Sequence, residues 1–200
     1  MTDIELNDPN LTRDEVYRRL PTLAHIDDKD IRDDVIHLSR HAPEYFWIRP
    51  GSYSGYHNGT RRGLWHHTLK LSKAIETLAP SRMEMGVLTP EDTDLAHAAA
   101  IIHDQWKNGA DPESDQTSDA HPHVAATLIR EHTDLNEVVA RAVREHMGAF
   151  DGKPHPSSAV SSLVHDADML ASDDEIRLAI ASPVPSELDE LVDETYTVEE

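Results

Sequence analysis

The stretch Leu95-Ala-His-Ala-Ala-Ala-Ile-Ile-His-Asp104 decides how this chain of 200 residues folds. Apolar residues fill nearly every position up to Ile102, so the helix that they predict has no side left for water. The stretch ends in His103 and Asp104, and burying these polar side chains costs several kcal/mol unless a partner satisfies them. Because adjacent His and Asp at a helix end can face one cation, the stretch predicts a central helix that ends in a metal-binding pair.

The charge of the chain is strongly one-sided. It carries 38 Asp and Glu against 18 Lys and Arg, a net charge of -20, and only five of the cations are Lys. Such an excess of carboxylates is typical of salt-loving organisms, where molar salt screens self-repulsion. We therefore expect a halophilic host; the alternative is an acidic protein from an ordinary host. The charge also disfavours nonspecific binding to nucleic acid or to an anionic membrane.

The composition disfavours cysteine-dependent sites, secretion and membrane insertion. The chain has no Cys, so it has no disulfide, no thiolate metal site and no cysteine nucleophile. Its first residues lack the basic and apolar parts of a signal peptide, and no apolar run approaches about 18 residues. We therefore expect a soluble, cytoplasmic protein that does not bind a membrane.

Helical periodicity and capping residues predict an all-α fold. Thr12 and Glu15 form a capping box at the start of one helix, and Thr89-Pro90 begins another. We also expect His121 and Asp134 to cap two later helices. The predicted helices span about 12–20, 30–41, 64–79, 91–105, 122–132, 135–147 and 157–171.

The segments between these helices suggest how the chain is organised. Residues 43–63, rich in Gly and aromatics, are predicted to form a long functional loop, and 108–120 a polar loop able to cover a site. The predicted parts are an N-terminal helical extension at 1–42, a main domain at 43–181 and an acidic tail at 182–200.

Periodicity also sorts the 14 histidines. Three of them lie on apolar helix faces: His67, His121 and His146. Their neighbours His66 and His123 align with polar residues and are predicted to face solvent. A single inward histidine is usually a satisfied core residue. Three on separate helices, beside His103-Asp104, indicate a metal site in the core of a helical bundle.

The last helix offers two candidates for a further carboxylate ligand. Asp168 follows Val160 and Val164 at intervals of four, whereas Asp166 follows Leu163 and precedes Leu170. Both aspartates share a helix face with apolar residues, so periodicity alone does not choose between them.

The order of these residues resembles the HD-domain superfamily of metal-dependent phosphohydrolases, over roughly residues 43–175. Gly63-Leu-Trp-His-His-Thr-Leu is similar to the family's first-histidine motif, with His67 as the ligand. Ile101-Ile-His-Asp-Gln-Trp-Lys is similar to its His-Asp motif, followed by a phosphate-facing lysine, Lys107. Trp106 departs from the Gly that many members have before that lysine.

Three further segments extend the resemblance. His121-Pro-His-Val-Ala-Ala resembles the third-histidine motif, and Glu145-His-Met-Gly-Ala-Phe the fourth. Ala167-Asp-Met-Leu resembles the closing motif, which selects Asp168 over Asp166. The stretch Gly51-Ser-Tyr-Ser-Gly-Tyr-His-Asn is similar to a subgroup found in viral and archaeal genomes and in HD-containing 3′–5′ exoribonucleases. Together with the charge, this resemblance implies a halophilic archaeon or its virus as the source.

The resemblance implies an HD helical bundle with a metal centre. A first ion would be held by His67, His103, Asp104 and Asp168. Asp104 would bridge to a second ion held by His121 and His146. One or two ions of Mn, Fe, Co, Ni or Zn suit these ligands. They would activate water for attack on phosphorus, with Asp104 and Lys107 as catalytic residues.

A locally positive segment supports an anionic substrate. Between Pro43 and Lys73 there are five cations against Glu44, so +5 - 1 = +4. We expect a phosphorylated small molecule, a nucleotide or a short single-stranded nucleic acid. Candidate phosphate-binding and base-stacking residues are Arg49, Arg61, Arg62, Tyr56, His57, Tyr53 and Trp65. The alternative is that these cations pair with the acidic surface.

Two other functions share this ligand pattern. HD-fold di-iron oxygenases resemble it, and so would a non-catalytic module that only binds a nucleotide. The complete ligand set disfavours the binding module, because degenerate domains usually lack one or more ligands. The prediction is therefore a metal-dependent phosphohydrolase that cleaves a nucleotide-type phosphomonoester or phosphodiester.

Overall fold

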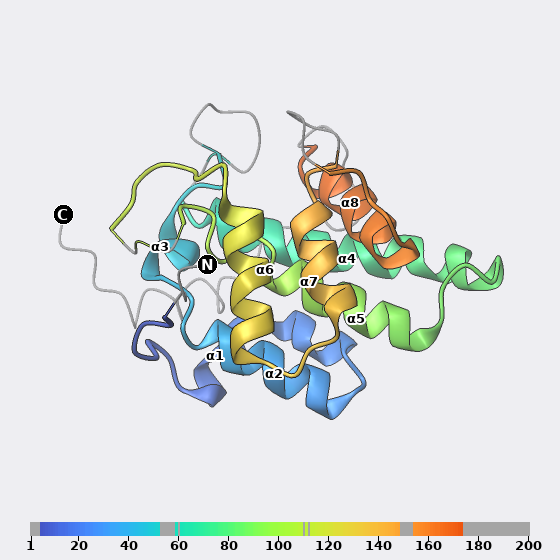
Figure 1. Cartoon of the computed structure of the whole chain (residues 1–200), viewed down its shortest axis with the longest axis horizontal. Helices are drawn as coiled ribbons and strands as arrows, with labels where there is room; N and C mark the ends of the chain where they lie inside the picture. The colour runs from blue at the N-terminus through green and yellow to red at the C-terminus, as the bar shows by residue number, and fades with distance from the viewer. Residues whose placement is uncertain are drawn as a thin grey trace.

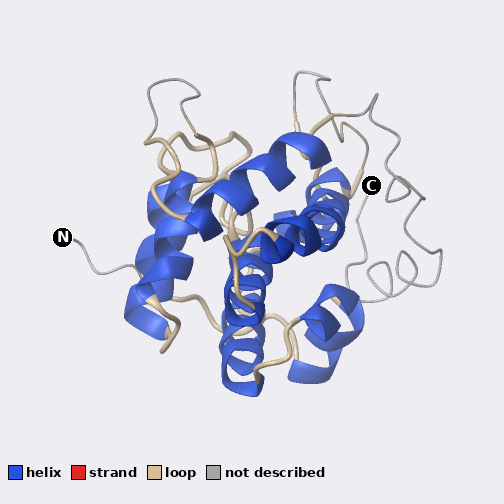
Figure 2. Ribbon diagram, turned by 90° about the vertical axis from the view of Figure 1, so that its right-hand side faces the viewer, coloured by secondary structure: helices blue, strands red, loops and turns tan. Residues whose placement is uncertain are grey.

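The computed structural model describes residues 5–52, 59, 61–109, 111, 113–148 and 154–173. This part of the chain is helical and contains no strand, as the sequence predicted (Figures 1 and 2). The elements are α1 (Arg13–Arg19), the 3₁₀ helix η1 (Pro21–His25), α2 (Lys29–Ser39), α3 (Glu44–Ile48), α4 (Gly63–Glu84), α5 (Pro90–Ile102), α6 (His121–His132), α7 (Glu137–Glu145) and α8 (Ala159–Ala171). None of the described helices is both long and apolar enough to cross a bilayer.

Helix α5 lies at the centre of the bundle. Thr89 caps it through a capping box with Asp92, and Pro90 occupies its first turn. Every residue from Asp94 to Ile102 is buried, because α2, α4, α7, α8 and η1 all pack against the helix. The prediction of a helix buried on all sides is therefore confirmed, and the His103-Asp104 pair is carried into the core.

The N-terminal helices pack against this core on one side (Figure 1). The predicted capping box between Thr12 and Glu15 is present at the start of α1. The turn between η1 and α2 is tied to α5, because the Asp94 carboxylate accepts the backbone N–H groups of Asp27 and Asp28 at 3.2 and 2.8 Å. A single buried carboxylate on α5 thus accepts two backbone N–H groups from the turn that precedes α2.

Helices α6 and α7 form an antiparallel pair whose α7 packs against α5, and α8 packs against both α4 and α7 (Figure 1). The apolar face of α7 explains this docking. Its buried residues Val139, Ala140, Ala142 and Val143 turn toward the bundle, whereas Arg141 and Arg144 lie on the other face.

Helix α4 is longer than predicted. The end was expected near residue 79, yet the helix continues to Glu84 with Pro80 inside it. The stop signal is Gly86, whose φ of 70° is left-handed. Its N–H bonds to the Met83 carbonyl, and the N–H of Val87 bonds to the Arg82 carbonyl. These two bonds form a Schellman motif, which ends the helix.

Three smaller predictions were wrong. The loop expected at 43–63 contains α3, because Tyr45, Phe46 and Trp47 turn helically to bury their rings together. His121 is the first residue of α6 and not its cap, since Ala120 holds that position. Helix α7 is capped by Asn136, whose side chain accepts the N–H of Val138, and not by Asp134.

Candidate metal centre

Six buried polar residues meet where five helices converge, and none is more than 4% exposed. Most of them stand at helix ends: His103 caps the end of α5, His121 opens α6 and His146 caps the end of α7. The six are His67 on α4, His103 and Asp104 after α5, His121 on α6, His146 after α7 and Asp168 on α8.

Three of the four imidazoles are oriented by the same local hydrogen bond. Nδ1 lies 2.7 Å from the main-chain carbonyl three residues earlier in His103, His121 and His146. A carbonyl only accepts, so each Nδ1 carries the proton and donates it. In the neutral ring each Nε2 then presents its lone pair to the centre, and this is the tautomer that a metal ligand needs.

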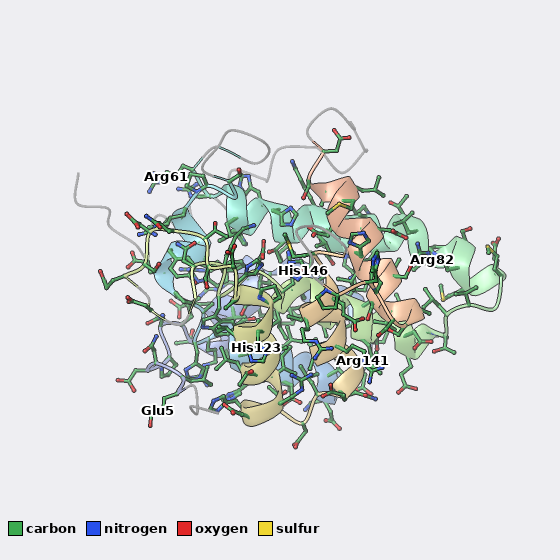
Figure 3. The ribbon with its side chains drawn as sticks, turned by 45° about the horizontal axis from the view of Figure 1, so that its top comes forward. Glu5, Arg61, Arg82, His123, Arg141 and His146 are labelled. Carbon is green, nitrogen blue, oxygen red and sulfur yellow. The ribbon has the colours of Figure 1, made fainter. Side chains whose placement is uncertain are left out.

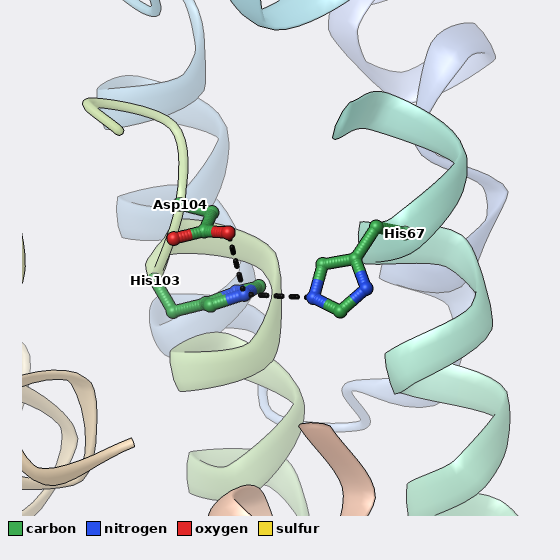
Figure 4. Close-up of side chains that lie close together, drawn as sticks. All are labelled: His67, His103 and Asp104. Carbon is green, nitrogen blue, oxygen red and sulfur yellow. Dashed lines mark hydrogen bonds and ion pairs between the residues drawn. The ribbon is translucent and has the colours of Figure 1, made fainter. Parts of the chain in front are cut away.

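One group of ligand atoms surrounds His103. Its Nε2 lies 3.3 Å from Nε2 of His67 and 3.5 Å from Oδ2 of Asp104, and Figure 4 shows the three side chains facing one another. Nε2 of His67 is in turn 2.9 Å from Oδ1 of Asp168. Helices α4, α5 and α8 therefore bring two imidazoles and two carboxylates together.

A second group lies on the other side of Asp104. Its Oδ1 is 3.2 Å from Nε2 of His121 and 3.8 Å from Nε2 of His146. The two histidine nitrogens are 3.4 Å apart. Each group could hold a metal ion, and Asp104 belongs to both. One oxygen of this carboxylate faces each group, which is the arrangement of a bridging ligand.

The donor set fits a divalent transition ion. Ligands about 2.1 Å from one ion lie about 3.0 to 3.4 Å apart at tetrahedral or octahedral angles, close to most of the separations seen here. His121 and His146 both donate from Nδ1, so their two Nε2 lone pairs face each other at 3.4 Å and repel unless a cation lies between them. Oδ1 of Asp104 is buried and accepts no hydrogen bond. A cation would satisfy both features.

The surroundings keep the two carboxylates ionised. Burial raises the pKa of Asp104, but the nearby Lys107 ammonium and His103 outweigh it and hold that pKa well below its ordinary value. Burial likewise raises the pKa of Asp168, and the hydrogen bond from His67 reverses the shift. Burial, reinforced by His103, lowers the pKa of His146 to about 3, which keeps its imidazole neutral and able to bind a metal.

Comparison with known families agrees with this geometry. A model of the HD domain matches residues 64–173, more than half of the chain. The chain belongs to the HD domain family. Members of this superfamily are mostly metal-dependent phosphohydrolases. No curated protein and no solved structure matches the chain.

The HD domain places the two candidate aspartates of α8 in different surroundings. Asp168 is buried against His67, whereas 47% of the Asp166 side chain is exposed and its carboxylate pairs with Arg82. His123 is exposed on α6, as periodicity predicted, and Figure 3 shows it on the outside of that helix. His66 was expected to face solvent and is half-buried instead.

Lys107, predicted to face a phosphate, contacts a candidate metal ligand in the HD domain. Its Nζ lies 2.6 Å from Oδ2 of Asp104. The turn from His103 to Lys107 brings the ammonium back over the preceding carboxylate. The ammonium is therefore next to the centre, where it can also reach an anion bound there.

The predicted substrate-binding arginines of the HD domain differ in burial and in their contacts. Arg49 donates to the Ser114 carbonyl at 2.6 Å and lies over the Tyr45 ring, so it helps to hold the loop before α6. Arg62 is buried beside the start of α4, with a left-handed φ of 64°. Arg61 is exposed, and Figure 3 shows it at the edge of the molecule, apart from His146.

Other residues proposed to bind the substrate have different outcomes. Trp65 cannot stack on a base, because it is fully buried and donates to the Arg19 carbonyl. The positive segment is also weaker than its count suggested, since Lys73 pairs with Glu76, just beyond the counted window. Tyr53, Tyr56 and His57 lie outside the described residues, and their predicted roles stay predictions.

Several polar residues around the HD centre were not singled out from the sequence. Glu145 is buried and accepts hydrogen bonds from Ser157, and His165 donates to the main chain of His146. Both stand within three residues of candidate ligands, and that proximity is the signal that could have found them. Their partners lie 12 and 19 residues away along the chain, a pairing that periodicity does not contain.

Proposed function

We propose that this HD domain is a metal-dependent phosphohydrolase that cleaves a nucleotide-type phosphomonoester or phosphodiester. The observation that carries the proposal is the sharing of Asp104 between two buried groups of ligand atoms. Paired ion sites joined by one carboxylate are suited to phosphoryl chemistry, because the attacking and leaving oxygens can each be stabilised.

In this proposal His67, His103, Asp104 and Asp168 hold one ion. Asp104, His121 and His146 hold the other. The mixture of imidazole and carboxylate ligands suits Mn, Fe, Co, Ni or Zn better than Mg. When bound, such ions supply Lewis-acid chemistry: they polarise the phosphoryl group and lower the pKa of water toward neutrality.

The chain itself contributes charge and position to the reaction. Asp104 is held ionised by its surroundings and so stays available as a bridging ligand at acidic pH. Lys107 is half-buried beside it, where its ammonium can stabilise negative charge that develops on the phosphoryl oxygens. Arg61, Arg62, Tyr56 and His57 remain candidates for the substrate's phosphate and base.

The decisive experiment measures metal-stimulated hydrolysis. The protein is loaded with Mn²⁺, Co²⁺, Ni²⁺ or Zn²⁺ in molar KCl, which suits the proposed halophilic host. It is then offered a panel of phosphomonoesters and phosphodiesters. We expect release of phosphate or nucleoside monophosphate, abolished in Asp104→Ala. Asp166→Asn is the matched control, because it removes a carboxylate from the same helix outside the centre.

Three outcomes would separate the alternatives. Hydrolysis that persists in Asp104→Ala, or that needs no metal, would overturn the proposal. Bound iron with a mixed-valence signal and no phosphate release would indicate the di-iron oxygenase. Tight nucleotide binding without turnover would indicate the non-catalytic module.

A further inference from the structure

The end of helix α7 is tied to helix α8 through the main chain of His146. Nδ1 of His165 lies 2.7 Å from the His146 carbonyl and must donate to it, since a carbonyl only accepts. His146 therefore has both ends fixed: its ring donates to the Val143 carbonyl, and its own carbonyl is held by α8. Nothing in this bond involves the ligand atom Nε2.

A second tie holds the residue just before His146. The carboxylate of Glu145 is buried and accepts the backbone N–H of Ser157 at 2.8 Å and the Ser157 hydroxyl at 2.8 and 2.9 Å. Ser157 directly precedes Ser158, which caps α8. The start and the middle of α8 are thus both bonded to the last residues of α7.

The His165 ring fits only because residue 148 is a glycine. Gly148 has a φ of 61°, and a Cβ added to it would meet Cε1 of His165 at 2.4 Å and the two ring nitrogens at 2.8 and 2.9 Å. Real Cβ atoms do not approach another atom so closely, so any side chain here would push the imidazole away. The ring lies directly against the turn that follows His146.

We infer that His165 is a positioning residue for the second ion, acting through the backbone of His146, and that Gly148 provides the space it needs. The inference rests on the proposed metal centre and assigns it a residue that touches no ion. His146 ends a helix and has no following helical turn to hold it. The position of its imidazole therefore depends on how firmly its backbone is held. Partners that orient a metal ligand typically change ion affinity about 10- to 100-fold when removed.

The test measures Mn²⁺ binding to the full chain by calorimetry, with metal analysis giving the number of bound ions. His121→Ala, which removes a ligand of the second group only, identifies the binding step that belongs to that group. We expect His165→Leu to lower the Mn²⁺ affinity of that step at least about tenfold and to change the affinity of the other step by less than about threefold. His165→Asn should restore most of the affinity, because its amide nitrogen can take the place of Nδ1.

Gly148→Ala provides an independent test with His165 intact. It should weaken the same step as His165→Leu, since the added methyl group displaces the ring. Gly86→Ala is its matched control: Gly86 has a similar φ of 70°, and an added Cβ there meets nothing within 4 Å. Both variants strain the backbone, so a difference between them isolates the contact with His165.

The inference is overturned if His165→Leu and Gly148→Ala bind both ions as the wild type does. It is also overturned if Gly86→Ala weakens binding as much as Gly148→Ala, or if the wild type binds fewer than two Mn²⁺. The proposed function fails separately, when protein carrying two ions hydrolyses no phosphate ester. Because binding is measured without a substrate, the two failures can be told apart.

Discussion

The buried imidazole of His97 should make the protein lose stability as the pH falls. His97 lies on α5 and is 1% exposed, with Nδ1 2.7 Å from the Ser72 hydroxyl of α4. The ring of His25, from η1, stacks on it with centroids 5.2 Å apart, and Glu76 of α4 pairs with His25. Burial, reinforced by the charge of His25, lowers the pKa of His97 from 6.5 to about 3.

The direction and size of the effect follow from the two pKa values. A lowered pKa in the folded state means that the unfolded chain binds the proton more tightly, so stability is complete above pH 6.5 and is lost between 6.5 and about 3. One pKa unit corresponds to about 1.4 kcal/mol. On going from pH 7.5 to pH 5, the pH passes about 1.5 units below the unfolded-state pKa of 6.5 while His97 stays neutral in the folded protein. His97 alone therefore lowers the free energy of unfolding by about 2 kcal/mol.

Urea unfolding of metal-free protein between pH 7.5 and pH 5 provides the measurement. His97→Gln keeps a polar side chain of similar volume but does not titrate, so its free energy of unfolding should fall about 2 kcal/mol less than that of the wild type. His123→Gln is the control, since folding does not bury that imidazole. Equal losses in wild type and His97→Gln would refute the reasoning.

Three further predictions concern the metal centre and the charge of the chain. Asp104→Asn should lower the binding affinity for both ions, each at least about 100-fold. Asp168→Asn should lower only the affinity for the ion beside His67, and metal titration measures both effects. Lys107→Gln should retain both ions but slow hydrolysis at least about tenfold, measured as phosphate release by metal-loaded protein. Raising KCl from about 0.1 M to about 2 M should raise the melting temperature by several degrees, because salt screens the net charge of -20.

Each of these has a result that would contradict it. Retention of either ion at wild-type affinity in Asp104→Asn would show that the carboxylate does not bridge. Loss of ions from Lys107→Gln would mean that the ammonium orders the ligands and does not act on the substrate. A melting temperature that is independent of KCl would remove the support that charge gives to a halophilic host.

Much of the fold was readable from local sequence. The capping box at Thr12 and the cap and proline at Thr89-Pro90 mark helix starts, since each device involves residues three positions apart or fewer. Periodicity also placed His67, His121 and His146 on inward faces. The predicted end of α4 near residue 79 was wrong, because the helix continues to Glu84 and ends in the Schellman motif at Gly86.

The sequence by itself determined that His67, His121 and His146 turn inward, because that depends on helical spacing over a few turns. Only the tertiary structure decided which atoms meet. In the folded chain Asp168 contacts His67, whereas Asp166 pairs with Arg82. One oxygen of Asp104 faces each group of ligands. Arg49 also donates a hydrogen bond to the Ser114 carbonyl, 65 residues away along the chain. Such contacts depend on how helices far apart in sequence pack together, and no local pattern contains that information.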